Sequence, residues 1–539
     1  MKSIDGEVLK RMLISGANNL YNHYPEIDAL NVFPVPDGDT GINMNLTLSS
    51  GAKEIYNRGD KNVGVIAQTF SRGLLMGARG NSGVITSQIF RGFAQYLKDK
   101  EEANAVDLSD AFVNGKDVAY KAVMRPVEGT ILTVIREASF VMQEEAKPNQ
   151  SIESIFKILL KEAKESLKRT PELLPILKEA NVVDSGGAGF VRILEGMLAA
   201  LEGNFIEKSE VLVEEASKNT LNNEAKQGYD VEFILELQER DDKKQFLEKR
   251  FVSVLESHAD DVKVTINDDE ISVHLVTETP GHIITYAHSF GEFSMVKITN
   301  LQPNMQKDET AIEEKKEKQD YAIIATSVGK GLDQLFKDLG VSIIVNGGQT
   351  MNPSTEDFIA AIKKANARQI FVLPNNSNIV MAASQACDVI DDDEVNAIVI
   401  PSKTIPQGIS ATMMFNPGIS FDENYMEMKN AIKCVKSGSI TYSIKDTDID
   451  GVHITKGYFM AISEGKIIGC EKTRSATLEM LVTNLIDDMS SVVTIIYGED
   501  ASKDETSKII KKLEKKFPDV EFDLREGDQP VYAYYVGVE

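Results

Sequence analysis

The sequence predicts a multidomain protein with an all-α N-terminal domain, a small α+β middle domain and an α/β C-terminal domain. Three observations support this. Helical periodicity continues from Ile4 to about Leu201, strand patterns replace it after a polar stretch, and strands alternate with helices from Tyr321 onward. The length of 539 residues agrees, because single hydrophobic cores rarely grow beyond roughly 250–300 residues.

The N-terminal domain, residues 1–203, is predicted to consist of helices joined by glycine-rich loops. In "SIFKILLKEAKESLKRT" the apolar residues Ile155, Ile158, Leu159 and Ala163 recur at helical spacing. Glycine-rich breaks occur at "GDTG", "GARGNSG", "PVEGT" and "VVDSGGAG". The conspicuous polar motifs therefore lie between helices, where functional loops are common.

The rest of the chain is predicted to contain two further domains. In residues 226–302, "YDVEFILELQ", "DVKVTINDDEISVHLVT" and "FSMVKITNLQ" have strand patterns around a helix at "KKQFLEKRFVSVLESH". Residues 303–319 are charged and poor in apolar side chains, as in a linker. In residues 320–539, strands such as "YAIIATS" and "QIFVLPN" alternate with helical segments, which predicts a parallel sheet with crossover helices.

Composition and the lack of certain sequence features argue against several classes of protein. The 58 basic and 83 acidic side chains give a formal net charge of -25, which argues against a nucleic-acid partner because the polyanion would be repelled. The cysteines Cys387, Cys434 and Cys470 are far apart and form no CxxC motif, which suits a reducing compartment. The N-terminus has no apolar signal region, and no apolar run is long enough to span a membrane. We expect a cytoplasmic protein with no transmembrane segment.

The stretch "NVFPVPDGDTGINMNLTL", Asn31 to Leu48, places two carboxylates at the start of a predicted helix. Asp37 and Asp39 flank a glycine, and ionising both is unfavourable unless a cation lies between them. With the amide oxygen of Asn31 they form an oxygen-only ligand set suited to Mg²⁺. The alternative is that Asp39 or Thr40 only caps the helix, which would explain one aspartate but not two.

Further loops in the same domain fit a nucleotide. "MGARGNSGVI" brings Asn81, Ser82 and Gly83 to a predicted helix start, where backbone N–H groups can surround phosphate. It is neither a Walker A loop nor a Rossmann fingerprint, because the required ending or preceding strand is missing. "VVDSGGAGF" adds Asp184 and Gly186, and Arg169 in "KRT" is a candidate phosphate clamp. Any one such loop is more often a plain connection, but four together favour a metal–nucleotide site.

These motifs carry a family resemblance. "LNVFPVPDGDTGINMNLTL", "GARGNSGVI", "RPVEGTILTVIREA" and "RTPELLPILKEANVVDSGGAGF", in this order, resemble the nucleotide-binding domain of dihydroxyacetone kinase. More closely they resemble the ATP-binding subunit of bacterial fatty acid kinase, whose layout extends over the whole chain. That match includes "GGQTMNPSTEDFIAAI", "LPNNSNIVMAASQA" and "IPSKTIPQGISA" in a DegV-like C-terminal domain.

The resemblance implies an all-α nucleotide-binding barrel that holds Mg–ATP. It implies that Asp37, Asp39 and Asn31 bind Mg²⁺ and that Arg169 lies near the transferred phosphate. Phosphoryl transfer needs positioning and charge neutralisation more than covalent chemistry from the protein, which agrees with these roles. The residues expected around the nucleotide are Thr40, Asn43, Asn81, Ser82, Gly83, Gly129, Asp184 and Gly186.

The expected function is that of an ATP-dependent kinase subunit. It would phosphorylate the carboxylate of a fatty acid presented by a separate DegV-family carrier, giving an acyl phosphate for phospholipid synthesis, with the C-terminal domain as the docking arm. We also expect a homodimer. Two alternatives remain open: a kinase for a small polyol or keto-sugar, and a nucleotide-sensing scaffold without turnover.

Two sequence patterns resemble metal-binding sites, but we do not expect either of them to bind a metal. "DTDIDG", Asp446 to Gly451, starts like an EF-hand loop, but position twelve is Gly457 and the flanks have strand patterns, so we expect a turn between strands. The middle domain of the resembled family can carry zinc on a cysteine and an HxH pair. Here Asp230 and Val276 replace two of those ligands and leave His274, so zinc is not expected, although His282 and His288 are nearby in sequence.

Overall fold

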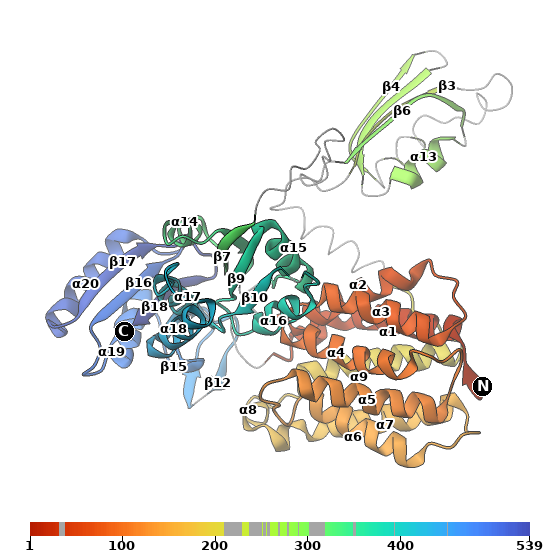
Figure 1. Ribbon diagram of the computed structural model, residues 1–539, viewed down its shortest axis with the longest axis horizontal. Coiled ribbons are helices and arrows are strands. Elements are labelled where there is room, and N and C mark those ends of the chain that lie inside the picture. Colours follow the sequence, from red (N-terminus) through yellow and green to blue (C-terminus); the bar gives the residue numbers. More distant parts are fainter. Residues whose placement is uncertain are drawn as a thin grey trace. The chain divides into compact units, whose positions relative to one another are not determined.

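The computed structural model describes residues 1–31, 38–209, 229–236, 251, 255, 259–267, 270–277, 280–288, 290–300, 318–348, 352–392, 394–449 and 451–539. Asp37 therefore lies outside the described residues, as does all but the end of the expected linker at 303–319. The described chain divides into two compact units. One comprises Met1–Lys208 with Glu317–Glu539, and the other Ser209–Lys316 (Figure 1).

The N-terminal part of the first unit is helical, as the sequence predicts. Its two short strands, β1 (Ser3–Ile4) and β2 (Ala103–Asn104), pair antiparallel. The apolar periodicity of "SIFKILLKEAKESLKRT" is explained by α7, in which Ile155, Leu159 and Ala163 are fully buried. The helices are α1 (Gly6–Asp28), α2 (Thr40–Tyr56), α3 (Val63–Gly77), α4 (Gly80–Leu97), α5 (Ala105–Ala122), α6 (Ile131–Glu145), α7 (Ile152–Leu173), α8 (Pro175–Glu179) and α9 (Ser185–Leu201).

A single apolar core holds these helices together. It contains a chain of aromatic contacts that runs across α3, α4, α5 and α7, with ring centroids between 5.0 and 6.1 Å apart. Aromatic pairs at these distances add favourable edge-to-face energy to the burial of their area. The rings belong to Phe70, Phe90, Phe93, Phe112 and Phe156. This core therefore holds the helices in place, and with them the polar loops at their ends.

The second unit contains a four-stranded antiparallel sheet of order β4-β5-β3-β6, together with helix α13. The expected helix at 243–258 lies almost entirely outside the described residues. The inward-facing residues of the sheet form their own apolar core, which includes Val231, Phe233 and Leu275. The elements are β3 (Tyr229–Glu236), β4 (Asp260–Asn267), β5 (Glu270–Thr277), α13 (Pro280–His288) and β6 (Glu292–Asn300).

The C-terminal part of the first unit has two main sheets (Figure 1). The predicted parallel sheet is present as four strands in the order β10-β9-β7-β8, with crossover helices between them. It consists of β7 (Gln319–Ser327), α14 (Lys330–Asp338), β8 (Ile343–Asn346), α15 (Thr355–Ala365), β9 (Ala367–Leu373), α16 (Val380–Val389) and β10 (Asn396–Val399).

The second main sheet is mixed, with six strands in the order β15-β14-β11-β18-β16-β17. Only β16 and β17 pair parallel; the other neighbours are antiparallel. The sequence did not predict this sheet, because pairing between distant strands leaves no local pattern. Its elements, with two preceding helices, are α17 (Ile405–Met413), α18 (Phe421–Cys434), β11 (Lys436–Tyr442), β14 (Phe459–Ser463), β15 (Lys466–Glu471), α19 (Arg474–Leu485), β16 (Val492–Tyr497), α20 (Lys503–Lys516), β17 (Glu521–Glu526) and β18 (Tyr532–Val538).

Short strands flank the EF-hand-like motif. β12 (Thr447–Ile449) and β13 (Val452–Ile454) pair antiparallel on either side of residues 450–451. The expectation of a turn between strands is confirmed by this pairing, since an EF-hand loop is flanked by helices.

The helical part and the C-terminal part share an apolar cluster. Ala78, between α3 and α4, and Val84, near the start of α4, are buried against α15 and α16 residues such as Phe358 and Ala382. This shared burial explains why the two parts form one compact unit. None of the helices in the described ranges is both long and apolar enough to cross a membrane.

Candidate nucleotide and metal site

A cavity of about 650 Å³ lies where the polar loops of the helical part meet, which is within the usual size of small-molecule sites. The loops come from distant parts of the sequence, and the starts of α2, α4 and α9 bring them together. Most of the residues expected at the site line this cavity. They are Asn31, Asp39, Thr40, Asn43, Asn81, Ser82, Asp184 and Gly186.

Asp39 occupies the N-cap position of α2, but its side chain makes no capping hydrogen bond. Asp28, at the end of α1, takes that role instead. Its Oδ1 accepts hydrogen bonds from the N–H groups of Gly41 at 2.6 Å and Ile42 at 3.4 Å. The capping alternative therefore does not account for Asp39.

The close approach of α1 to α2 also requires a glycine. A Cβ atom on Gly41 would lie 2.3 Å from the carbonyl oxygen of Tyr24. Burial raises the pKa of Asp28 to about 6, although the two N–H donors oppose the shift. Asp28, to which the sequence analysis gave no role, thus caps the start of α2 in place of Asp39.

Asn31 ties the starts of α2 and α9 together. Its Oδ1 accepts hydrogen bonds from the hydroxyl of Thr40 at 2.9 Å and, more weakly, from that of Ser185 at 3.5 Å. Its Nδ2 is buried without a hydrogen-bond partner in the described structure. The backbone oxygen of Asn31 accepts from Lys445 Nζ at 2.9 Å, and burial lowers the pKa of that lysine.

The oxygen donors around Asp39 and Asn31 fit a hard divalent cation. The Asp39 carboxylate and the Asn31 amide side chain line the same cavity, and Mg²⁺ prefers oxygen ligands of these kinds. Asp37, the other expected ligand, is outside the described residues.

The "GARGNSG" motif forms the start of α4. Gly80 has a φ of 59°, in the left-handed region, and a Cβ there would lie 2.6 Å from Asn43 Nδ2. The next two residues, Asn81 and Ser82, line the cavity in the first turn of the helix. Gly83 does not line it. A Cβ on Gly83 would lie 2.3 Å from Thr47 Oγ1, so this glycine permits α2 and α4 to pack closely.

Asp184 is the N-cap residue of α9. Its Oδ2 accepts a hydrogen bond from the Gly187 N–H at 2.6 Å, and burial raises its pKa to about 6. Gly129, which was also expected at the nucleotide, does not line the cavity. Its φ is 82° and its N–H donates to Thr133 Oγ1 at 2.8 Å, so in this structure it shapes the turn before α6.

Arg169 also lies outside the cavity lining. Its Nη2 pairs with Glu162 Oε1 at 2.6 Å and with Glu137 Oε2 at 2.7 Å, and these two bonds raise its pKa. Within the described lining, the basic side chains are Arg125 and Lys403. Both are exposed, and the sequence reading assigned neither a role.

The C-terminal part supplies one wall of the cavity, which the sequence reading did not anticipate. Asn376, Ser377 and Asn378 follow strand β9, and Lys403 follows β10. Ligands often bind beyond the carboxyl ends of parallel strands, so "LPNNSN" after a predicted strand was a usable indication. The remaining residues of this wall are Met381, Ile462, Gly465 and Tyr532.

Three family models together match most of the chain. A model of the DAK2 domain matches residues 34–199. Models of the middle domain and the C-terminal domain of FakA-like fatty acid kinase proteins match residues 226–308 and 322–539. Protein YloV of Bacillus subtilis (strain 168) is 42% identical over 556 residues, which cover 100% of both chains.

The chain belongs to the FakA-like fatty acid kinase family.

Another full-length relative of this FakA-like protein is an uncharacterized protein of Staphylococcus aureus (strain MRSA252), 41% identical over 100% of both chains. Among solved structures, a DegV family protein of Corynebacterium glutamicum matches 41% of this chain and 97% of its own, with 16% identity and a TM-score of 0.31. The Streptococcus pneumoniae Fak B3 protein loaded with linoleic acid matches 41% and 99%, with 11% identity and a TM-score of 0.29. Values this low support no argument about function.

A second cavity, of about 390 Å³, adjoins the first in this FakA-like protein. Its floor lies at the carboxyl ends of the parallel strands, where Ser327 ends β7 and Gly347 follows β8. Its lining mixes hydroxyl, amide and lysine groups with apolar side chains. The two cavities share a wall, formed by Asn376, Ser377, Lys403, Ile462, Gly465 and Tyr532.

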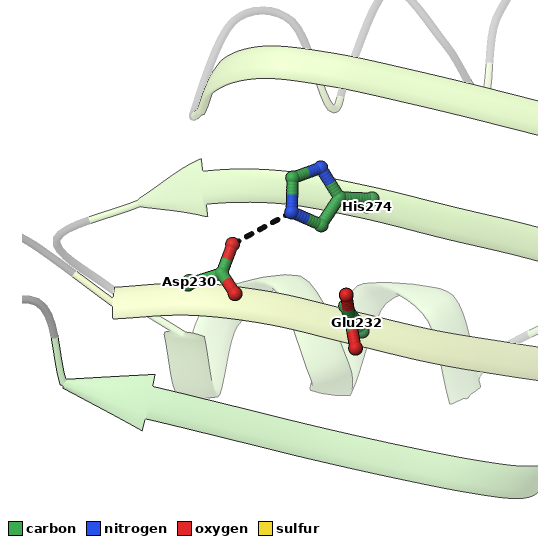
Figure 2. A group of neighbouring side chains, drawn as sticks. All are labelled: Asp230, Glu232 and His274. Atoms are coloured by element: carbon green, nitrogen blue, oxygen red, sulfur yellow. Dashed lines mark ion pairs between the residues drawn. The ribbon is translucent and has the colours of Figure 1, made fainter.

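The middle domain contains a group of three side chains that could together approach a cation (Figure 2). His274 on β5 pairs through Nε2 with Asp230 Oδ1 on the neighbouring β3, at 2.7 Å, and Glu232 lies beside them. Val276 is the cross-strand partner of Asp230, so the second position of an HxH pair carries no ligand. Glu232 also lies 3.4 Å from Lys297 Nζ.

We predict that this group holds no stoichiometric zinc, because one imidazole and two carboxylates are a poor substitute for four nitrogen and sulfur ligands. Elemental analysis of protein purified without chelators should give far less than one zinc per chain. The variant His274→Ala should have the same metal content. One zinc per chain that disappears in His274→Ala would contradict the prediction.

We predict that Asp184→Asn stabilises the protein at high pH. Its pKa rises from 3.8 in the unfolded chain to about 6 in the folded protein, so the folded state loses stability as the pH rises from about 4 to about 6. Asparagine caps a helix as well as aspartate but does not ionise. The variant should have a free energy of unfolding about 1–3 kcal/mol higher at pH 8, and nearly the same at pH 4. Urea unfolding at both pH values tests this, and a difference that does not change with pH would contradict it.

Proposed function

We propose that this FakA-like protein transfers the γ-phosphoryl group of ATP to the carboxylate of a fatty acid held by a separate carrier. The observation that carries the proposal is Asp39, which stands at the start of α2 without capping it and faces a cavity lined by polar loops. Family membership supports kinase chemistry, and the DAK2 match covers most of the lining residues that come from the helical part.

In this proposal Asp37, Asp39 and Asn31 hold Mg²⁺ bound with the nucleotide. When bound, Mg²⁺ neutralises charge on the phosphates. The proposal also assigns phosphate binding to N–H groups at the start of α4, where no side chain caps the helix, since helix N-termini commonly bind phosphate. The neighbouring side chains of Thr40, Asn43, Asn81, Ser82 and Asp184 position the nucleotide.

Cations are needed near the transferred phosphoryl group. Arg169 remains our candidate on the family motif, but in this structure Glu137 and Glu162 bind its guanidinium. Arg169 could act only after its guanidinium leaves these two glutamates and binds phosphate instead. Arg125 and Lys403 already line the cavity, and their exposed charges can attract the polyanionic nucleotide without a rearrangement.

The acceptor requires no strong general base. A fatty carboxylate is ionised at neutral pH, and its oxygen is itself the nucleophile. The new bond joins this oxygen to the γ-phosphorus, and the bond from the γ-phosphorus to the β–γ bridging oxygen breaks. ADP and an acyl phosphate are the products. Positioning and charge stabilisation therefore account for the catalysis that the protein must supply.

We further propose that the C-terminal domain docks the carrier and that the protein acts as a cytoplasmic homodimer. The wall that this domain contributes to the cavity supports a docking role near the site of transfer. The division into residues 1–203, 226–302, 303–319 and 320–539 remains a prediction, although the described elements are compatible with it.

A transfer assay tests the proposal. Purified protein, Mg²⁺ and γ-labelled ATP are mixed with a fatty-acid-loaded carrier, and the label is followed into a hydroxylamine-sensitive acyl phosphate. A parallel reaction with dihydroxyacetone tests the small-polyol alternative. Label in the sugar but not in the acyl product would favour that alternative, and label in neither would favour the scaffold.

A further inference from the structure

Asn352 of the C-terminal domain contacts the candidate metal carboxylate of the helical domain. Its Nδ2 donates a hydrogen bond to Asp39 Oδ2 at 2.5 Å, although 313 positions separate the two residues. The backbone oxygen of Asn352 accepts from Arg79 Nη1 at 2.8 Å, and Arg79 is the N-cap residue of α4. Asn352 thus contacts the starts of two helices that line the cavity.

The immediate surroundings hold Asn352 in place. It is 2% exposed. Two residues later Ser354 begins a capping box that starts α15, and the Thr355 N–H donates to the Ala78 carbonyl at 3.1 Å. The start of α15 therefore holds the backbone next to Asn352, and this keeps the side-chain amide beside Asp39.

The orientation of the amide has an unfavourable consequence. Because Nδ2 faces the carboxylate, Oδ1 points away, and it is buried with no hydrogen-bond partner in the described structure. A buried acceptor without a partner lowers stability, and an apolar residue of similar shape would avoid that loss. The unpaired Oδ1 lowers the stability that the side chain contributes, and the hydrogen bond to Asp39 gives the asparagine a specific role.

We propose that Asn352 is a positioning residue for Asp39, so that the C-terminal domain helps to build the cation site of the helical domain. Carboxylates that bind metals are usually oriented by a second hydrogen bond, and loss of that bond typically weakens metal binding about 10–100-fold. Asn352 supplies such a bond to Oδ2 and thereby helps to orient the carboxylate. The inference rests on the proposed function, because it requires that Asp39 bind a cation.

The test is Asn352→Leu in the full-length protein. Leucine has a similar volume but removes both the donor and the unpaired acceptor. We expect Mn²⁺ binding, measured by electron paramagnetic resonance with a non-hydrolysable ATP analogue present, to weaken about 10–100-fold. The melting temperature should change little, because the unpaired acceptor is removed and water can reach the half-buried Asp39 carboxylate that loses its donor. In transfer assays the Mg²⁺ concentration for half-maximal rate should rise, while the rate at saturating Mg²⁺ should change much less.

A matched control separates positioning from domain packing. Gln385 is also buried between the same two domains, where it bonds Gln88 at 2.8 Å and the Leu75 carbonyl at 2.9 Å without touching Asp39. Gln385→Met should lower the melting temperature and leave Mn²⁺ affinity unchanged. Asn352→Ala, which adds no bulk, should weaken Mn²⁺ binding as Asn352→Leu does.

The outcomes are distinguishable. Equal Mn²⁺ affinity in the wild type and both Asn352 variants would overturn the inference and leave the proposed function intact. Equal weakening by Gln385→Met would also overturn it, because general packing would then explain the effect. No Mn²⁺ binding by the wild type would overturn the proposed cation site, and the inference with it.

Discussion

Asp39→Asn is expected to reduce phosphoryl transfer by on the order of 100-fold or more. Asparagine keeps the size of the side chain but replaces a charged oxygen ligand with a neutral amide, so the cation and the phosphates would be held less well. The fold should survive, since the Asp39 side chain does not cap α2. The measurement is the initial rate of acyl phosphate formation over a range of Mg²⁺ concentrations, with melting temperature as the check on folding.

Asp28→Asn provides the control for that experiment. Asp28 does not line the cavity, and its Oδ1 accepts hydrogen bonds from the N–H groups of Gly41 and Ile42, the second and third residues after Asp39. An asparagine Oδ1 can accept the same hydrogen bonds, so transfer should remain within a few-fold of the wild type. Full activity of Asp39→Asn, or equal loss in both variants, would contradict the assignment of Asp39 to the cation.

Omission of the carrier is expected to lower transfer to a long-chain fatty acid by at least about 100-fold, because the carrier would supply the positioning of the acceptor. Each methylene left in water forgoes about 0.8 kcal/mol of burial. The two adjoining cavities have mixed linings, with asparagine, serine, threonine and lysine among the apolar residues. A long acyl tail is better covered by a separate protein.

The comparison uses the same purified protein with free fatty acid, with fatty-acid-loaded carrier, and with carrier that lacks fatty acid. Only the second reaction should form acyl phosphate at an appreciable rate. Equal rates with free and carrier-bound fatty acid would contradict the carrier requirement. Attention would then move to the second cavity, whose shared wall would bring an acyl group close to the nucleotide.

Much of the helical part and of the site could be predicted from local sequence patterns. Helix starts, glycine breaks and clustered polar residues are local features of the sequence. For this reason Asp39, Asn81 and Asp184 could be assigned to one site, although they lie at the starts of three separate helices. The parallel sheet was predictable for the same reason, because each strand and crossover helix has its own periodicity.

The rest depends on contacts between residues that are far apart in the chain. Nothing near Asp28 indicates that it serves the start of α2, and nothing near Asn352 indicates that it meets Asp39. The ion pairs of Arg169 depend on Glu137 from another helix, so a motif alone could not show that its guanidinium is already bound. The six-stranded mixed sheet likewise pairs β11 with β18, far apart in the chain.

The bond from Asp28 to the Gly41 N–H closes a loop that spans the whole candidate metal-binding segment between α1 and α2. A backbone amide protected by such a bond exchanges with solvent deuterium only when the bond opens. The exchange rate of the Gly41 amide therefore reports how often the hydrogen bond between the end of α1 and the start of α2 opens. Measured with and without nucleotide, this rate tests whether nucleotide stabilises the start of α2, and it needs no substitution and no assay of turnover.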